Sequence, residues 1–535
     1  MNLRLTWVQP EDLLGHELRQ AAEDGRDARA VAARWAEAGG PPAPGTAGAS
    51  GVPRPDLRPL AEELMDALAA LPAPLSDSEP TSLPGIRALT APGATPPPAP
   101  HSPSSPAPSQ APAPAPHDAP PPPHQTSAPP PPHQTSAPPP PHQTSAPPPA
   151  HQTSAPPPPH ATATPLPAPE TGGPPNPPPP HGNTALRDRL HAAWLGRAAG
   201  CLLGKPVEKL PLHAIRALAR ATGNWPLSTW FTARGVPPEL LAAHPWNRRS
   251  APTSLAENID GMPEDDDLNY PLLNLLLLRR HGRGFTTADV ARLWLDELPA
   301  GRTFTAERVA YRNLLDGIEP PLTAVHRNPF REWIGAQIRA DVHGWTRPGD
   351  PAAAAEQAYR DATLTHTANG VYGAMFVAAT LATAATGTSD VHRSLAGGLA
   401  VIPPRSRLAR AVRRGIALAR DTRDFDTVVD RLHLELGGYH WVHAVPNAAL
   451  LAAALTHADG DFTRSIGAAV SGGWDTDSNG ATAGSVAGLL AGHPDRLPEH
   501  WTTPLKNRLA TSVPSFDGIG FDTLAELTHR EAVRP

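Results

Sequence analysis

The chain has 535 residues, of which 73 are proline, and a formal net charge of −6 at pH 7. Ordinary globular structure cannot accommodate that many prolines, so part of the chain is expected to be unfolded. The weakly acidic balance gives no electrostatic basis for direct binding to nucleic acid or to an anionic membrane. A single cysteine, Cys201, excludes an intramolecular disulfide framework and fits a reducing compartment.

The start of the chain lacks a cationic segment followed by an apolar core. The most apolar run, Pro271 to Leu278, is too short to span a bilayer. We therefore expect a soluble cytoplasmic protein without a membrane partner.

Residues 1–90 are predicted to form a short helical segment. Leu13 to Ala38 and Leu57 to Leu71 are amphipathic, and a Gly-Gly-Pro-Pro sequence at residues 39–42 separates them. Two helices of this length bury little apolar surface by themselves. We expect them to dock on the main domain, and the alternative is a small independent interaction module.

Residues 91–182 are predicted to form a disordered linker. They consist mostly of Pro, Ala, Ser, Thr and His, with tandem copies of Ala-Pro-Pro-Pro-Pro-His-Gln-Thr-Ser. Such a composition favours an extended, semi-stiff polyproline II chain with no core. A passive spacer is the preferred interpretation. The alternatives are a partner that recognises the proline-rich motif and weak metal binding by the evenly spaced histidines.

Residues 183–535 are rich in Ala and Leu and almost free of alternating β-branched runs, which predicts an all-α domain. Two expected helices carry glycine at every fourth position. An interior glycine costs a helix up to about 1 kcal/mol relative to alanine, so such stripes persist where helix backbones approach closely. The stripes are Gly196, Gly200 and Gly204 in the first helix, and Gly480, Gly484, Gly488 and Gly492 in the other.

Two acidic clusters, Glu264 to Asp267 and Asp475 with Asp477, each precede an apolar, helix-compatible run. Helix capping would explain one carboxylate in each. Four consecutive acids repel one another, however, and a hard cation with oxygen ligands is the usual way to hold them together. A calcium-binding EF-hand starting at Asp475 is excluded, because Val486 stands where the loop requires a bidentate glutamate.

Three further positions could carry chemistry. Glu208 follows the first glycine-striped helix and would deliver a carboxylate, although on its own sequence context it is better explained as a surface acid beside Lys205 and Lys209. His366 lies on a polar turn before an Ala-rich helix, where it could line a pocket or cap the helix. Asn447, inside an apolar helix, is expected to hydrogen-bond a loop.

His440 and His443 are three residues apart, a spacing that permits joint zinc binding. No cysteine pair accompanies them in the sequence, so we do not favour a zinc site there.

Taken in order, the motifs Gly-x-x-x-Gly-Cys-x-x-Gly-Lys-Pro-Val-Glu, Glu-Asp-Asp-Asp and Gly-Gly-x-Asp-Thr-Asp-Ser-Asn-Gly-Ala resemble those of the ADP-ribosylglycohydrolase family. This family includes the ADP-ribosylarginine and ADP-ribosylserine hydrolases and the dinitrogenase reductase-activating glycohydrolase. The resemblance covers about Leu186 to the C-terminus. It implies a compact all-α fold with a binuclear site for Mg²⁺ or Mn²⁺ at the bottom of a cleft, where the distal ribose of ADP-ribose binds.

Carried over by position, the resemblance implies metal ligands at Glu264, Asp265, Asp266, Asp475, Asp477 and Ser478. It implies Glu208 as general acid or base, with Asp266 also in a catalytic role. The expected substrate-binding residues are Trp474, His366 and Asn447.

The sequence departs from the family pattern in three places. Glu264 replaces a neutral ligand, Trp474 stands where a second glycine is usual, and Gly204-Lys205-Pro206 replaces Gly-Asp-Ala. The expected reaction is metal-dependent hydrolysis of the bond between ADP-ribose and a protein side chain or related acceptor. The alternatives are a glycosidase for a small nucleoside or nucleotide, and a non-catalytic ADP-ribose-binding scaffold.

Overall fold

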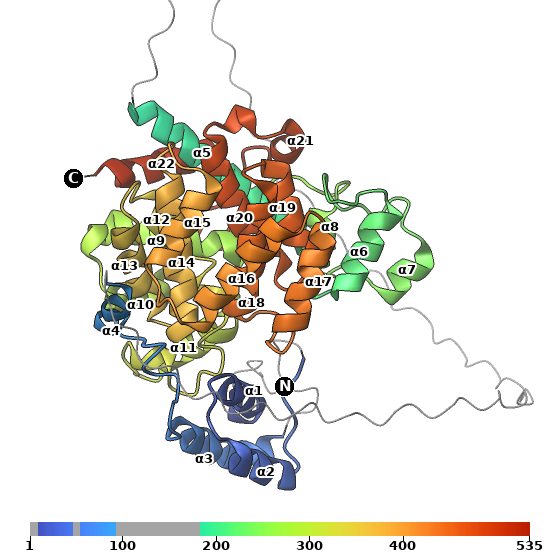
Figure 1. Cartoon of the computed structure of the whole chain (residues 1–535). Helices are drawn as coiled ribbons and strands as arrows, with labels where there is room; N and C mark the ends of the chain where they lie inside the picture. Colours follow the sequence, from blue (N-terminus) through green and yellow to red (C-terminus); the bar gives the residue numbers. More distant parts are fainter. Residues whose placement is uncertain (1–8, 46–53, 92–181, 535) are drawn as a thin grey trace, which may run out of the picture. The chain divides into compact units, whose positions relative to one another are not determined.

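The computed structural model describes residues 9–45, 54–91 and 182–534. The predicted linker and its repeat histidines fall almost entirely outside these ranges. Within them every regular element is helical, and extended pairing is limited to three isolated bridges (Figure 1). The predicted all-α fold class is confirmed. In the same ranges, no helix combines the length and the apolar character that crossing a bilayer requires.

Two glycine-rich helices, α5 (Gly182–Gly204) and α20 (Thr476–Ala491), lie against each other as an antiparallel pair. A Cβ added to Gly200 would lie 1.9 Å from the carbonyl oxygen of Gly480. Any side chain there would force the helices apart, which confirms that the glycine stripes mark close backbone approach. Gly492 is not part of the stripe as predicted, because it is the left-handed residue that ends α20 (φ 82°).

Further helices pack around this pair. The longest are α9 (Asp266–His281), α14 (Ala368–Ala384), α16 (Arg407–Asp421) and α18 (Ala444–Ala458). The other α-helices of residues 182–534 are α6 (Leu212–Ala221), α7 (Pro238–Ala243), α8 (Ala251–Ser254), α10 (Thr287–Glu297), α11 (Thr305–Leu315), α12 (Asp341–Trp345), α13 (Pro351–Ala362), α15 (Val391–Ala400), α17 (Phe425–Leu436), α19 (Phe462–Ser471), α21 (Glu499–Thr502) and α22 (Phe521–Val533).

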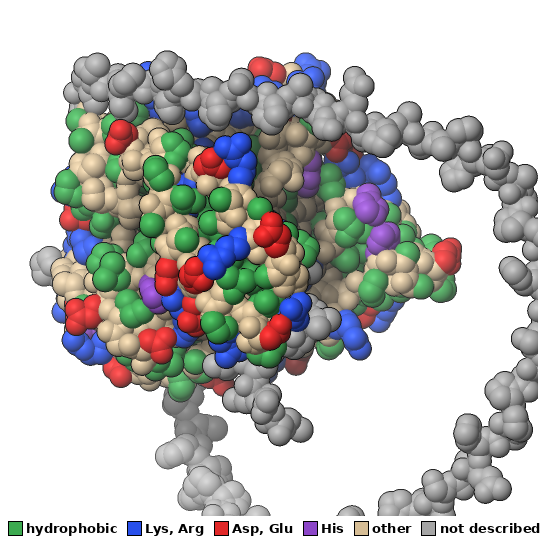
Figure 2. All heavy atoms as spheres, turned by 90° about the horizontal axis from the view of Figure 1, so that it is seen from below, with side chains coloured by type: hydrophobic (Ala, Val, Ile, Leu, Met, Phe, Trp, Pro, Cys, Tyr) green, Lys and Arg blue, Asp and Glu red, His purple; other side chains and the backbone are tan. Residues whose placement is uncertain are grey.

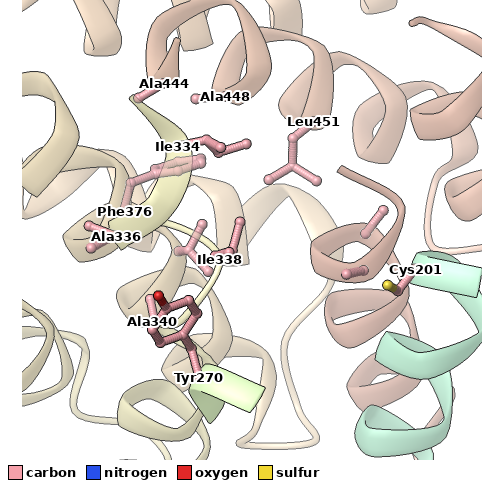
Figure 3. Close-up of a cluster of buried hydrophobic side chains, with 14 of the residues drawn as sticks. Cys201, Tyr270, Ile334, Ala336, Ile338, Ala340, Phe376, Ala444, Ala448 and Leu451 are labelled. Carbon is pink, nitrogen blue, oxygen red and sulfur yellow. The ribbon is translucent and has the colours of Figure 1, made fainter. Parts of the chain in front are cut away.

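An irregular segment, residues 334–340, runs through the core between three of these helices (Figure 3). Its apolar side chains are buried, and they contribute to the same core as side chains of α9, α14 and α18. The residues in this cluster are Ile334, Ala336, Ile338 and Ala340 of the segment, Tyr270 of α9, Phe376 of α14, and Ala444, Ala448 and Leu451 of α18.

The second turn of α9 contains a proline, Pro271. Proline has no N–H, so the carbonyl of Asp267, four residues earlier, loses its helical partner. The fully buried Arg197 of α5 replaces that partner, donating from Nε to the Asp267 carbonyl at 2.8 Å. The proline thus creates the acceptor through which α5 is joined to the first turn of α9.

The N-terminal segment forms α1 (Pro10–Glu23), α2 (Arg29–Glu37), α3 (Arg58–Ala69) and α4 (Leu83–Thr90). The helix predicted from residue 13 to residue 38 is therefore two helices. The chain turns between them at Gly25, which has a left-handed backbone (φ 72°). The sequence pattern gave no indication of α4.

These helices dock on the larger helical region, as predicted, through buried ion pairs. Arg407, at the start of α16, pairs with Glu79 at 2.7 Å and with Glu332 at 3.0 Å. Arg331 pairs with Glu17 of α1 at 2.7 Å. On the side where α1, α2 and α3 lie, acidic and basic side chains are interspersed rather than segregated (Figure 2).

Candidate metal centre

The second acidic motif lies on a tight turn that leads into α20. Gly473 and Trp474 both have a left-handed backbone, with φ values of 76° and 53°. This conformation is unfavourable for a residue with a side chain. Trp474 is held in it by stacking on His433, with 4.0 Å between ring centroids and 8° between ring planes. The turn therefore presents Asp475 and the start of α20 in a defined orientation.

Asn447 of α18 supports the same turn. Its side-chain oxygen accepts the backbone N–H of Asp475 at 3.1 Å and the side-chain amide of Asn479 at 2.7 Å. Its own amide donates to the carbonyls of Trp441 at 2.8 Å and His443 at 2.9 Å. These bonds use both N–H donors and both lone pairs of the carbonyl oxygen of the side chain. The expectation that Asn447 hydrogen-bonds a loop is confirmed, and a direct contact with substrate stays a prediction.

The first acidic motif caps α9 and reaches the second motif. Asp265 is the N-cap residue, and its carboxylate accepts the backbone N–H of Asp267 at 2.9 Å. The buried Asp267 carboxylate accepts the hydroxyl of Ser478 at 3.3 Å and pairs with Arg197 at 3.3 Å. The two motifs therefore meet where the end of α5 and the starts of α9 and α20 come together.

Cys201 of α5 lies beside this junction, with its sulfur 4.0 Å from the Asp267 carboxylate. Ligand atoms of Cys201, Asp265 and Asp267 all lie within 4.8 Å of one another, close enough to share an ion. Burial, followed by the neighbouring carboxylates, raises the pKa of the Cys201 thiol well above its ordinary value. The thiol is therefore neutral, and the available donors are carboxylate oxygens. Such a donor set fits a hard divalent cation such as Mg²⁺ or Mn²⁺.

The carboxyl groups of the two motifs act on each other. Burial, and then neighbouring carboxylates that include Asp477, raises the pKa of Asp266 well above its ordinary value. Burial and the charge of Asp477 do the same for Asp475. Burial and then Glu208 raise the pKa of Asp477 to about 7. A cation among these groups would relieve their repulsion and stabilise the ionised forms.

Lys205 enters the cluster from the end of α5. The residue is 7% exposed, and its ammonium group pairs with Asp265. Burial lowers the pKa of Lys205, but the charge and hydrogen bond of Asp265 together with the other acidic neighbours outweigh this effect, so that the pKa lies above its ordinary value. The ammonium is therefore charged. The sequence pattern assigned Lys205 no role in the site.

Glu208 lies at the edge of the cluster, with 18% of its side chain exposed. One carboxylate oxygen pairs with Lys209 at 2.7 Å, and the other accepts the side-chain amide of Asn247 at 2.7 Å. Its charge acts on both Asp475 and Asp477. Glu208 is thus the carboxylate that combines proximity to the motifs with access to solvent.

The family model of the ADP-ribosylglycohydrolases matches residues 182–533, a range that contains Glu208 and both acidic motifs. The chain belongs to the ADP-ribosylglycohydrolase family. A solved structure described as an ADP-ribosylglycohydrolase-related protein complex is similar over 65% of this chain and 100% of that chain, with 21% identity and a TM-score of 0.41. Among curated proteins, the search found no match.

In this ADP-ribosylglycohydrolase family member, the predicted ligand Glu264 has polar contacts with residues outside the two motifs. The carboxylate of Glu264 accepts the amide of Asn269 at 2.9 Å and pairs with Arg302 at 3.1 Å. Asp267, the last acid of the same run, contacts Ser478 and Cys201 instead. Asp267 was absent from the predicted ligand set. The sequence could have indicated Asp267, because it is the fourth of four consecutive acids. Only some side chains of such a run can face one site.

His366 lies in a different buried network. Its Nδ1 is 2.6 Å from the hydroxyl of Thr365, and its charged neighbours are Glu307 and Arg339. Burial, with the charge of Arg339, lowers its pKa well below the ordinary value, so the ring is neutral. That His366 contacts substrate stays a prediction, as does the same expectation for Trp474.

Both ring nitrogens of His440 are engaged, one with the carbonyl of Gly45 at 3.1 Å and the other with the backbone N–H of Val442 at 3.3 Å. His440 therefore has no free lone pair with which to share a zinc ion with His443. The zinc alternative receives no support.

Besides Asp267, sequence reasoning missed the site residues Arg197 and Lys205. Arg197 directly follows Gly196, and Lys205 directly follows Gly204. Both glycines face the backbone of α20 at contact distance. In a sequence, a charged residue next to a glycine that packs against another helix therefore indicates a buried charge. Such a charge needs a partner.

Proposed function

We propose that the protein is a metal-dependent hydrolase that cleaves the glycosidic bond between ADP-ribose and a protein side chain or related acceptor and releases ADP-ribose. The observation that carries this proposal is the convergence of the two acidic motifs, with Glu208 beside them, at the junction of α5, α9 and α20. Membership of the ADP-ribosylglycohydrolase family supports the reaction class.

The residues that would hold Mg²⁺ or Mn²⁺ are Asp265, Asp266, Asp267, Asp475 and Asp477. A cation bound there would supply a Lewis acid that orients sugar hydroxyls and favours the ionisation of water. The oxygen-only donor set, with a neutral thiol at its side, supports this choice of metal.

Hydrolysis of a ribosyl bond passes through an oxocarbenium-like transition state with positive charge at the anomeric carbon. The surrounding carboxylates would stabilise that charge. Glu208 would take a proton from the attacking water or give one to the leaving group. Lys209 and Asn247 each hold one of its oxygens, so the orientation of the carboxylate is set before substrate binds.

Release of ADP-ribose from ADP-ribosylated arginine, serine, nucleic acid and small ADP-ribosyl compounds tests the proposal, with Mg²⁺, Mn²⁺ or a chelator present. We expect metal-dependent release of ADP-ribose from at least one substrate. Asp475→Ala should lose both metal binding and turnover while its circular dichroism stays helical. Glu208→Gln should keep metal binding, measured by isothermal titration, and lose about 100-fold or more in turnover.

Two results would contradict the proposal. The first is unchanged metal binding in Asp475→Ala, which would separate the carboxylate cluster from the metal. The second is tight ADP-ribose binding with no turnover of any substrate, which would identify a non-catalytic binding protein. Turnover of only the small compounds would shift the substrate class to a nucleoside or nucleotide glycoside.

A further inference from the structure

The backbone leaves the Lys205 side chain little freedom of position. At Gly204, the residue before it, a Cβ would lie 2.3 Å from the carbonyl oxygen of Thr476 and 2.4 Å from the amide nitrogen of Asp477. Lys205 thus begins where α5 touches the first turn of α20. Only 7% of the residue is exposed, so its side chain is largely enclosed at this junction.

Lys205 adjoins both acidic motifs. Its ammonium group pairs with Asp265 of the first motif, and Gly204, the residue before it, packs against the backbone of Asp477 in the second motif. A lysine ammonium is a compact point charge with three donors. It can therefore serve carboxylates from both motifs, which is what a bridging cation would do.

We propose that the Lys205 ammonium occupies one cation position of the carboxylate cluster, so that the protein binds one divalent ion where the family resemblance implied two. This inference rests on the proposed function, because it concerns the same metal site. A second divalent ion would be repelled by the buried positive charge of Lys205.

The number of Mn²⁺ ions bound by the metal-free full chain tests the inference, counted by isothermal titration and by equilibrium dialysis with elemental analysis. Wild type should bind one ion. Lys205→Met, which removes the charge and keeps most of the chain length, should bind two. Lys205→Arg retains the charge and should bind one. Lys506→Met is the matched control and should bind one, because the Lys506 side chain is 59% exposed and pairs with Asp260, outside both motifs.

Electron paramagnetic resonance provides a second measurement of the same quantity. Two neighbouring Mn²⁺ ions couple magnetically, so only Lys205→Met should show a coupled spectrum. Circular dichroism identifies a variant that fails to fold. If Lys205→Met fails to fold, the number of Mn²⁺ ions bound by wild type decides. A single ion without magnetic coupling would support the inference.

Two ions in wild type, or one ion in a folded Lys205→Met variant, would overturn the inference and leave the proposed metal-dependent hydrolase intact. Absence of Mn²⁺ binding in all variants, together with turnover that a chelator does not affect, would instead remove the proposed function and this inference with it. The failures of the two proposals are therefore distinguishable.

Discussion

The side-chain oxygen of Asn447 lies 3.1 Å from the backbone nitrogen of Asp475 and accepts its N–H. Through this bond the second acidic turn is held by α18, a helix that supplies none of the carboxylates. The N-cap residue of α18 is His443, whose Nε2 lies 3.4 Å from a carboxylate oxygen of Glu23 in α1. The start of α18 thus lies close to the docked N-terminal segment, and the same helix holds the turn that presents Asp475.

Replacing Asn447 should weaken the metal site without removing a carboxylate. Asn447→Ala leaves the N–H of Asp475 and the amide of Asn479 without their common acceptor, so the turn can relax. Loss of such a supporting hydrogen bond typically lowers metal affinity about 10- to 100-fold. Isothermal titration with Mn²⁺ measures the change. As a control, Asn224→Ala removes a buried amide that bonds only within its own loop and should leave metal affinity unaltered.

The α5–α20 contact should tolerate no added methyl group at its centre. In Gly200→Ala the new Cβ would lie 1.9 Å from the Gly480 carbonyl oxygen, and that neighbour is backbone. We expect a loss of about 3 kcal/mol in the free energy of unfolding, measured by denaturant titration. Gly301→Ala is the matched control, because nothing lies within 4 Å of its added Cβ. Equal stability of the two variants would show that α5 and α20 are less closely packed than described.

Much of this architecture could be predicted from residue patterns. The glycine stripes predicted close helix packing, and the acidic clusters before apolar runs predicted carboxylates at the starts of two helices. Both are local signals, since each depends on residues within a few turns of one helix. The break between α1 and α2 at Gly25 was not predicted, because amphipathic periodicity continues on both sides of it.

The rest of the site depends on contacts between distant segments. Asp267 rather than Glu264 faces Ser478, and the buried Arg197 that accompanies it binds the carbonyl that Pro271 leaves free. The burial of Lys205 follows from the distance between two helix backbones, which no single stretch of sequence specifies. Such tertiary effects override local expectations for charged residues.

Arg407 should be essential for docking of the N-terminal segment. Arg407→Met leaves Glu79 and Glu332 buried without their main counter-charge, a loss that typically costs about 3 to 5 kcal/mol. Denaturant unfolding and amide hydrogen exchange of α1 measure the effect. Arg414→Met, on the same helix, removes a half-exposed pair with Glu435 and should cost under about 1 kcal/mol. Similar small losses in both variants would show that the buried pairs do not hold the segment.

The metal-free protein should lose stability as pH rises above neutrality. Burial is the main cause that raises the pKa of Glu23 and Glu307 to about 7 and that of Glu332 to about 8. The folded state therefore binds protons that the unfolded state releases at lower pH, so its advantage declines as pH rises through these pKa values. Buried histidines such as His440, whose pKa burial lowers to about 3, oppose this trend only below about pH 6.5. We expect these three groups to lower the free energy of unfolding by roughly 4 kcal/mol between pH 6.5 and about 9. Denaturant titrations across that range should show a shallower decline in the free energy of unfolding for Glu332→Gln. The decline should be unchanged for Glu356→Gln at the surface. Stability that rises with pH would contradict the burial of these carboxyl groups.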